Sequence, residues 1–96
     1  MIDVAELQRQ GKTIWRIVTA HKCTSPRVFG SVVAGTNTAD SDVDLLVDEL
    51  PDATLLDIAR LELALQQEFG VRFDVNTPLS LPRAWRQSVL DGAIPL

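Results

Sequence analysis

Apolar and polar residues follow two different spacings along this chain, and the spacings predict helices and short strands in mixed order. Apolar residues recur at helical intervals in three segments: residues 3–21, 54–69 and 82–90. Short apolar or alternating runs predict three strands: residues 27–29, 42–47 and 71–76. The pattern therefore predicts an α/β (α+β) fold, with a small three-stranded mixed sheet flanked by helices.

The helix predicted over residues 54–69 has the clearest boundaries. Thr54 is a plausible N-cap, and Gly70 follows the last turn. The residues expected to form its core-facing stripe recur every three or four positions: Leu55, Ile58, Leu61, Leu65 and Phe69. The helix predicted over residues 3–21 has a similar stripe but is weakened locally by Gly11.

Gly30 and Ser31 follow the first predicted strand directly. Gly30 allows a turn without a Cβ clash, and residues 32–34 are expected to form a short helix that stops at Gly35. The Ser31 hydroxyl and the first free backbone N–H groups would then point out of the helix start, where an anion such as a phosphate can bind. Taken alone, the Gly-Ser pair indicates only a strand-to-helix turn. Its distance to the acids that follow is what favours a functional role.

Asp42 and Asp44 open the second predicted strand after a polar turn over residues 36–41. Side chains two positions apart on a strand share a face, so both carboxylates are expected to project together while Val43, Leu45 and Val47 pack on the other side. Adjacent carboxylates repel each other unless a cation lies between them. Mg²⁺ suits this pair, because it takes oxygen ligands from one or two carboxylates and from substrate phosphates.

Asp74 is a candidate third acid. Residues 71–76 alternate apolar with polar, which places Arg72, Asp74 and Asn76 on one face of the third predicted strand. Asp74 could meet Asp42 and Asp44 across the sheet, although an acid on a half-exposed strand is commonly only solvated. Carboxylates that hold divalent ions against a nucleoside triphosphate are suited to in-line nucleotidyl transfer, in which the third acid takes the proton from the incoming hydroxyl.

Residues 28–47, V-F-G-S-V-V-A-G-T-N-T-A-D-S-D-V-D-L-L-V, resemble the G-S-x10-D-x-D core of the polymerase-β-type nucleotidyltransferases. The short chain is similar to their minimal (MNT) branch, and the likeness extends over nearly the whole sequence. The resemblance implies a polymerase-β-like core in a single domain, residues 1–96. It also implies that Gly30 and Ser31 bind the triphosphate of ATP, that Asp42 and Asp44 ligate Mg²⁺, and that Asp74 completes the catalytic, metal-binding triad.

Members of this branch often act as antitoxins of HEPN-type ribonuclease toxins. The resemblance implies a protein adenylyltransferase that moves AMP from ATP onto a hydroxyl of the partner toxin.

One residue departs from the family pattern: Ala34 stands where many members have Arg, and a cation there would help neutralise transition-state charge. The alternative is therefore an antitoxin with weak or no catalysis that neutralises the ribonuclease by direct contact. Arg72 or Lys22 could replace the missing cation, but spacing places neither in the site. Transfer to a small molecule is disfavoured, because no extra domain exists to build an acceptor pocket.

Composition limits the partners and the compartment. The net charge of −4 argues against a broad grip on nucleic acid, and no apolar run approaches the roughly 20 residues that span a bilayer. The first residues lack the basic start and apolar core of a signal peptide, and the single cysteine, Cys23, requires no oxidising compartment. We expect a cytoplasmic protein that assembles with itself or with its partner.

The remaining conspicuous residues have structural interpretations. His21 is expected to be a helix-end cation, because the chain has no second His and no Cys pair to complete a metal site. Cys23 is expected to be a partly buried small residue. Asp40, Asp48 and Glu49 are expected to be surface charges. Trp15 and Trp85 are expected in the core or in an interface, and the sequence does not choose between these.

Overall fold

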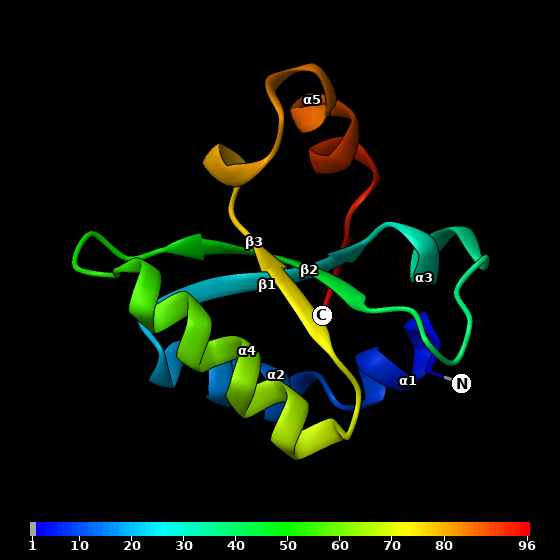
Figure 1. Cartoon of the computed structure of the whole chain (residues 1–96), viewed down its shortest axis with the longest axis horizontal. Coiled ribbons are helices and arrows are strands. Elements are labelled where there is room, and N and C mark those ends of the chain that lie inside the picture. The colour runs from blue at the N-terminus through cyan, green and yellow to red at the C-terminus, as the bar shows by residue number, and fades with distance from the viewer. Residues whose placement is uncertain (1) are drawn as a thin grey trace.

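The computed structural model describes residues 2–96 as a sheet with helices on both sides (Figure 1). The elements follow in chain order: α1 (Val4–Arg9), α2 (Gly11–Ala20), β1 (Cys23–Phe29), α3 (Ser31–Ala34), β2 (Val43–Glu49), α4 (Leu55–Phe69), β3 (Phe73–Asn76), the 3₁₀ turn η1 (Pro78–Ser80), α5 (Arg83–Gly92) and β4 (Ile94–Pro95). The predicted helix–strand order is confirmed, and the mixed α/β class with it.

The sheet has four strands in the order β3-β2-β1-β4, one more than the sequence predicted. β1 is antiparallel to both β2 and β4, whereas β2 and β3 run parallel. The additional strand, β4, has only two residues, Ile94 and Pro95, which pair with Val28 and Arg27. A segment this short has no alternation of its own, so its sequence carries no strand pattern.

The main core lies between the sheet and the pair of helices α2 and α4, which run along one face (Figure 1). From β2 this core receives Val43, Leu45 and Val47, all buried as predicted. From α4 it receives Leu61 and Leu65, both fully buried. Leu55 was predicted to continue this stripe, but it is 87% exposed. It is the first residue of α4, directly after the N-cap Thr54, and the stripe packs only farther along the helix.

Two N-terminal predictions need correction. The single helix expected over residues 3–21 is two helices, because the helix is interrupted at Gln10. This residue is the C-cap of α1 and the N-cap of α2. The first strand starts at Cys23 instead of residue 27 and contains Pro26. Proline is tolerated there because the β1–β2 register shifts between Thr24 and Arg27, which is a bulge.

The opposite face of the sheet is covered more thinly. Leu46 is fully buried there, near η1 and the buried Leu81. Helix α5 stands beyond them (Figure 1), and none of its residues is buried. Trp85 on α5 is 65% exposed and is therefore not a core residue. Part of this face is consequently open to solvent.

Within residues 2–96, none of the helices has both the length and the apolar character that crossing a membrane requires.

Candidate functional site

Gly30 forms the turn between β1 and α3, as the sequence predicted. Its φ of 75° lies in the left-handed region, which a residue with a Cβ adopts only with strain. Ser31 is the first residue of α3, and the helix ends after one turn at Gly35, where φ is again 75°. The backbone N–H groups of Val33 and Ala34 bond to the Gly30 carbonyl. The turn therefore places Ser31 at the edge of the sheet, next to the end of β1.

The sheet register brings Asp44 beside two of the other candidate residues. In the antiparallel pair Asp44 lies opposite Phe29, the residue before Gly30, and in the parallel pair it lies opposite Asp74. Asp42 precedes β2 by one residue, at the same end of the strand. β3 is tied to α4 by the Glu62 carboxylate, which accepts a 2.8 Å hydrogen bond from the Val75 N–H. The structure thus gathers the acids at one end of the sheet, on the face away from the main core.

Gly30 and Asp44 approach each other closely. A Cβ placed on Gly30 would lie 2.2 Å from Oδ2 of Asp44 and 3.1 Å from its Cγ, far inside van der Waals contact. Any side chain at position 30 would therefore push the Asp44 carboxylate aside. The sequence predicted Gly30 for its backbone freedom, whereas the structure adds a second reason, which is the space that Asp44 needs.

We expect Gly30→Ala to weaken nucleotide binding, because the new methyl group displaces Asp44. Gly70→Ala is the matched control, since Gly70 has φ of 70° but nothing within 4 Å of the added Cβ. Both variants should lose stability from the strain of a positive φ, and Gly30→Ala should lose more because its Cβ also meets Asp44; denaturant unfolding measures both losses. Only Gly30→Ala should lose affinity for ATP in calorimetry, and equal affinities in the two variants would contradict the contact.

Asp44 is the acid whose ionisation the site disfavours most clearly. Burial, followed by the nearby carboxylates of Asp74 and Asp42, raises the pKa of Asp44 above its ordinary value of 3.8. The two neighbouring carboxylates therefore add to burial in disfavouring the ionised form of Asp44. A bound cation would relieve the repulsion and favour the ionised form of Asp44.

The raised pKa of Asp44 predicts that its charge destabilises the fold at neutral pH. Because the folded state holds this proton more tightly than the unfolded chain, the penalty is absent below the unfolded value of 3.8 and complete above the folded pKa. Asp44→Asn should therefore unfold at higher denaturant concentration than the parent at neutral pH, with the difference vanishing near pH 3. An Asn variant less stable than the parent at neutral pH would contradict this prediction.

Arg72 also lies at the site, a placement that the sequence could not supply. Its Nε forms an ion pair of 3.1 Å with Oδ1 of Asp42, and one terminal nitrogen donates a 3.4 Å hydrogen bond to the Asp40 carbonyl. Lys22, the other cation considered for this role, instead pairs with Asp52 at 3.4 Å. The sequence placed Arg72 on the same strand face as Asp74, but its spacing gave no reason to expect contact with Asp42.

The donor set suits a hard cation, but its side chains are not arranged as a finished cage. Among residues 2–96, no three His, Cys, Asp or Glu side chains come close enough together to hold one metal ion. Asp42 is turned toward Arg72 instead. The carboxylate oxygens and the mutual repulsion at Asp44 nevertheless fit Mg²⁺, which usually takes one or two protein carboxylates and completes its shell with water and phosphate oxygens.

Two depressions are lined by candidate site residues. One is lined by Asp42 with residues of the preceding loop, among them Asn37, Thr38 and Ser41. The other is lined by Gly30, Ala34 and the α5 residues Ser88 and Val89. Asp42 and Gly30 are therefore each reached by a depression of the surface.

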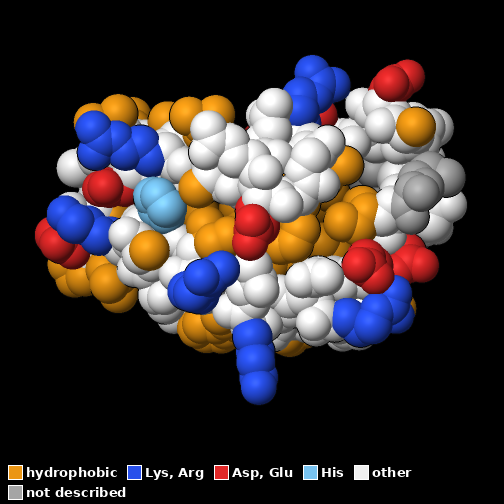
Figure 2. Space-filling view, turned by 90° about the horizontal axis from the view of Figure 1, so that it is seen from below, with side chains coloured by type: hydrophobic (Ala, Val, Ile, Leu, Met, Phe, Trp, Pro, Cys, Tyr) orange, Lys and Arg blue, Asp and Glu red, His pale blue; other side chains and the backbone are white. Residues whose placement is uncertain are grey.

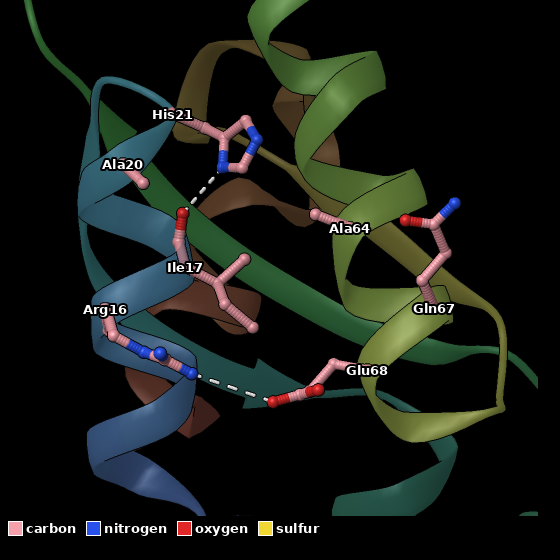
Figure 3. A pocket seen from close by; sticks show the side chains of 7 residues that line it. All are labelled: Arg16, Ile17, Ala20, His21, Ala64, Gln67 and Glu68. Atoms are coloured by element: carbon pink, nitrogen blue, oxygen red, sulfur yellow. Dashed lines mark hydrogen bonds and ion pairs between the residues drawn. The ribbon is translucent and has the colours of Figure 1, made fainter.

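A separate groove lies between α2 and α4, on the other face of the sheet (Figure 3). In this groove Arg16 pairs with Glu68 at 3.7 Å, and Nδ1 of His21 lies 2.7 Å from the Ile17 carbonyl. The space-filling view of this helical side shows apolar side chains between scattered charges (Figure 2). None of the candidate site residues lines the groove, so we place the chemistry at the acids.

The other residues singled out in the sequence are structural. His21 is the C-cap of α2, as expected, and Cys23 is fully buried where partial burial was expected. Trp15 is 38% exposed, and its indole N–H donates a 3.2 Å hydrogen bond to the Leu96 carbonyl. Asp40 and Glu49 are exposed, as expected, while Asp48 pairs with Arg27 at 3.4 Å.

The mixed sheet, with the Gly-Ser turn and the acids at one end of its strands, defines a small α/β protein. The nucleotidyltransferase domain family matches residues 12–94, and the chain belongs to this family. A solved structure provisionally described as a minimal nucleotidyltransferase is 41% identical and has a TM-score of 0.85, covering 99% of this chain and 97% of that one. The fold is accordingly polymerase-β-like, as the sequence predicted, and the chain is a nucleotidyltransferase.

Two named relatives carry a more specific activity in their names. Protein adenylyltransferase MntA of Thermococcus cleftensis is 38% identical over 82 residues, which are 77% of this chain and 83% of the relative. A Methanocaldococcus jannaschii protein, provisionally named protein adenylyltransferase MJ0435, is 28% identical over 93 residues, 97% of both chains. A crystal structure of a toxin–antitoxin with AMP-PNP shares the fold at TM-score 0.73 and 20% identity, covering 88% of this chain and 70% of that one.

Proposed function

We propose that this chain is an antitoxin that transfers AMP from ATP onto a hydroxyl of a partner toxin of the HEPN ribonuclease type. The observation that carries the proposal is the register that sets Asp44 beside both Asp74 and the Gly30 turn. Two relatives named protein adenylyltransferase support a protein as the acceptor. The toxin–antitoxin complex with AMP-PNP, which shares the fold, supports a toxin as the partner and an adenine nucleotide as the substrate.

In this proposal each residue has a distinct task. Gly30 and Ser31 would bind the triphosphate at the start of α3, and Asp42 and Asp44 would hold Mg²⁺. When bound, Mg²⁺ neutralises phosphate charge and orients the reacting oxygens. Asp74, exposed beside Asp44, accepts the proton of the attacking acceptor hydroxyl. That oxygen forms the new bond to the α-phosphorus of ATP, and pyrophosphate leaves with the electron pair of the broken bond.

The partner and the compartment belong to the same proposal. An exposed Asp74 and an open face beside α5 leave room for a protein surface to present its hydroxyl. We place the protein in the cytoplasm, where ATP and Mg²⁺ are available, as a single domain over residues 1–96.

A second function is favoured by one residue. Ala34 on α3 is exposed and neutral where many members of the family have Arg, which predicts less charge stabilisation in the transition state. An antitoxin with weak or no catalysis could still neutralise the ribonuclease by direct contact.

Intact-mass spectrometry of the partner distinguishes these two functions. The chain carries an affinity tag in its source organism and is isolated with its partner, while an Asp74→Asn form is isolated in parallel. The transferase predicts a partner heavier by one or more AMP groups with the parent and unmodified with the variant. An unmodified partner bound equally to both forms would contradict transfer and support neutralisation by contact.

A further inference from the structure

Arg72 is held firmly by its backbone and loosely by its side chain. Its carbonyl accepts a 2.8 Å hydrogen bond from the Val43 N–H, which fixes its position directly beside the start of β2. Its side chain, by contrast, is 67% exposed and reaches Asp42, whose side chain is 43% exposed. The backbone therefore fixes the position of the Arg72 Cα. The exposed side chain remains free to exchange one ion-pair partner for another.

Arg72 is also the cation best placed to act at the acids. Among the ion pairs of residues 2–96, the Arg72–Asp42 pair is the one that includes a site carboxylate. Arg27 and Lys22 are engaged at the other end of β2 and beyond, with Asp48 and Asp52. Helix α3, at whose start the triphosphate would bind, has the sequence Ser-Val-Val-Ala and carries no cation. A positive side chain beside the phosphates would therefore have to come from another element.

We propose that Arg72 is a positioning and phosphate-binding residue that supplies this charge. In the nucleotide-free protein its guanidinium holds Asp42 and offsets the repulsion among the acids. When a metal-bound triphosphate enters, Asp42 turns to the metal, and the released guanidinium binds a phosphate oxygen. This inference rests on the proposed nucleotide site, and it assigns to Arg72 the positive charge that α3 does not supply.

The exchange of partners is energetically reasonable. An exposed ion pair contributes little, typically up to about 1 kcal/mol, so releasing Asp42 costs little. An arginine–phosphate contact is charge-assisted and often bidentate, which makes it stronger than a single-point surface pair. Because Mg²⁺ binds a carboxylate and phosphates together, the phosphates arrive close to the carboxylate that Arg72 leaves.

Two binding measurements on Arg72→Gln test the proposal without relying on turnover. One is the affinity for Mn²⁺ alone, followed by electron paramagnetic resonance. The other is the affinity for a Mg²⁺-bound ATP analogue with a non-cleavable α–β bridge, followed by calorimetry. We expect Mn²⁺ to bind about two- to fivefold more tightly, because a competing cation is gone. We expect the nucleotide to bind about tenfold more weakly, because its phosphate contact is lost.

Arg16→Gln is the matched control, since Arg16 is 73% exposed and paired with Glu68 on the far side of the sheet. It should change neither affinity, and Arg72→Lys should restore part of the nucleotide affinity. Opposite shifts in Arg72→Gln support the proposal, because a merely structural role would not tighten one ligand and weaken the other. An unchanged or tighter nucleotide affinity overturns it, whereas a parent protein that binds neither ligand overturns the proposed function itself.

Discussion

Replacing Asp42 and Asp44 together by Asn is expected to abolish Mg²⁺-dependent nucleotide binding and to lower the transfer rate by about a thousandfold or more. The substitution removes both proposed metal-ligating carboxylates without removing core volume, because Val43 and Leu45 carry the packing of this part of β2. The fold should therefore survive. Calorimetry with ATP and Mg²⁺ measures the binding, and circular dichroism reports whether the sheet and helices are intact.

The matched control makes the same change in net charge at the other end of the same strand. Asp48→Asn combined with Glu49→Gln removes two negative charges near the end of β2, away from Gly30 and Asp74. This control should bind ATP as the parent does. Equal loss of affinity in both double variants would show that total charge matters and would remove the metal-site assignment from Asp42 and Asp44.

Leu61→Ala is expected to have the largest effect on stability, a loss of about 2–5 kcal/mol. Leu61 is fully buried on α4, within the core that packs against β2 and β3. The substitution leaves a cavity that a close-packed interior fills only in part. A denaturant titration of parent and variant measures the difference in the free energy of unfolding.

Leu63→Ala on the same helix provides the control, because Leu63 is 55% exposed and faces away from the core. Its effect should stay within about 0.5 kcal/mol. Both substitutions remove the same side-chain atoms from the same helix, so the difference in helix propensity between Leu and Ala cancels in the comparison. Similar losses in the two variants would contradict the assignment of the buried face of α4.

The parts of the fold that follow from local rules were predictable from the sequence. Thr54 and Gly70 cap α4 as expected, with a complete capping box between Thr54 and Asp57. The alternation around Asp74 correctly predicted that Phe73 and Val75 are buried. These features depend on neighbours within a few positions, which is the range over which the sequence is directly informative.

Features that depend on distant contacts were not predictable. Strand β4 exists because residues 94–95 meet β1, far away along the chain. The first strand was predicted to start at residue 27, yet β1 starts at Cys23 and includes Pro26, which the bulge accommodates. Leu55 fits the helical stripe of α4 in sequence but lies at the first turn, beyond the packed part of the helix.

The candidate site divides in the same way. The spacing of Gly30, Asp42 and Asp44 was visible in the sequence, and the register of β2 with β3 then brought Asp74 beside Asp44. Two details required the structure: the space at Gly30 that Asp44 occupies, and the pairing of Arg72 with Asp42. Both are contacts between segments that no sequence spacing connects.

The most direct test of the central proposal is transfer of label from α-labelled ATP to the isolated partner in the presence of Mg²⁺. The parent and the Asp42→Asn/Asp44→Asn form are compared at equal concentration. We predict label on the partner with the parent and none with the double variant. Label that appears equally with both forms, or with neither although both bind the partner, would contradict catalysis by these carboxylates.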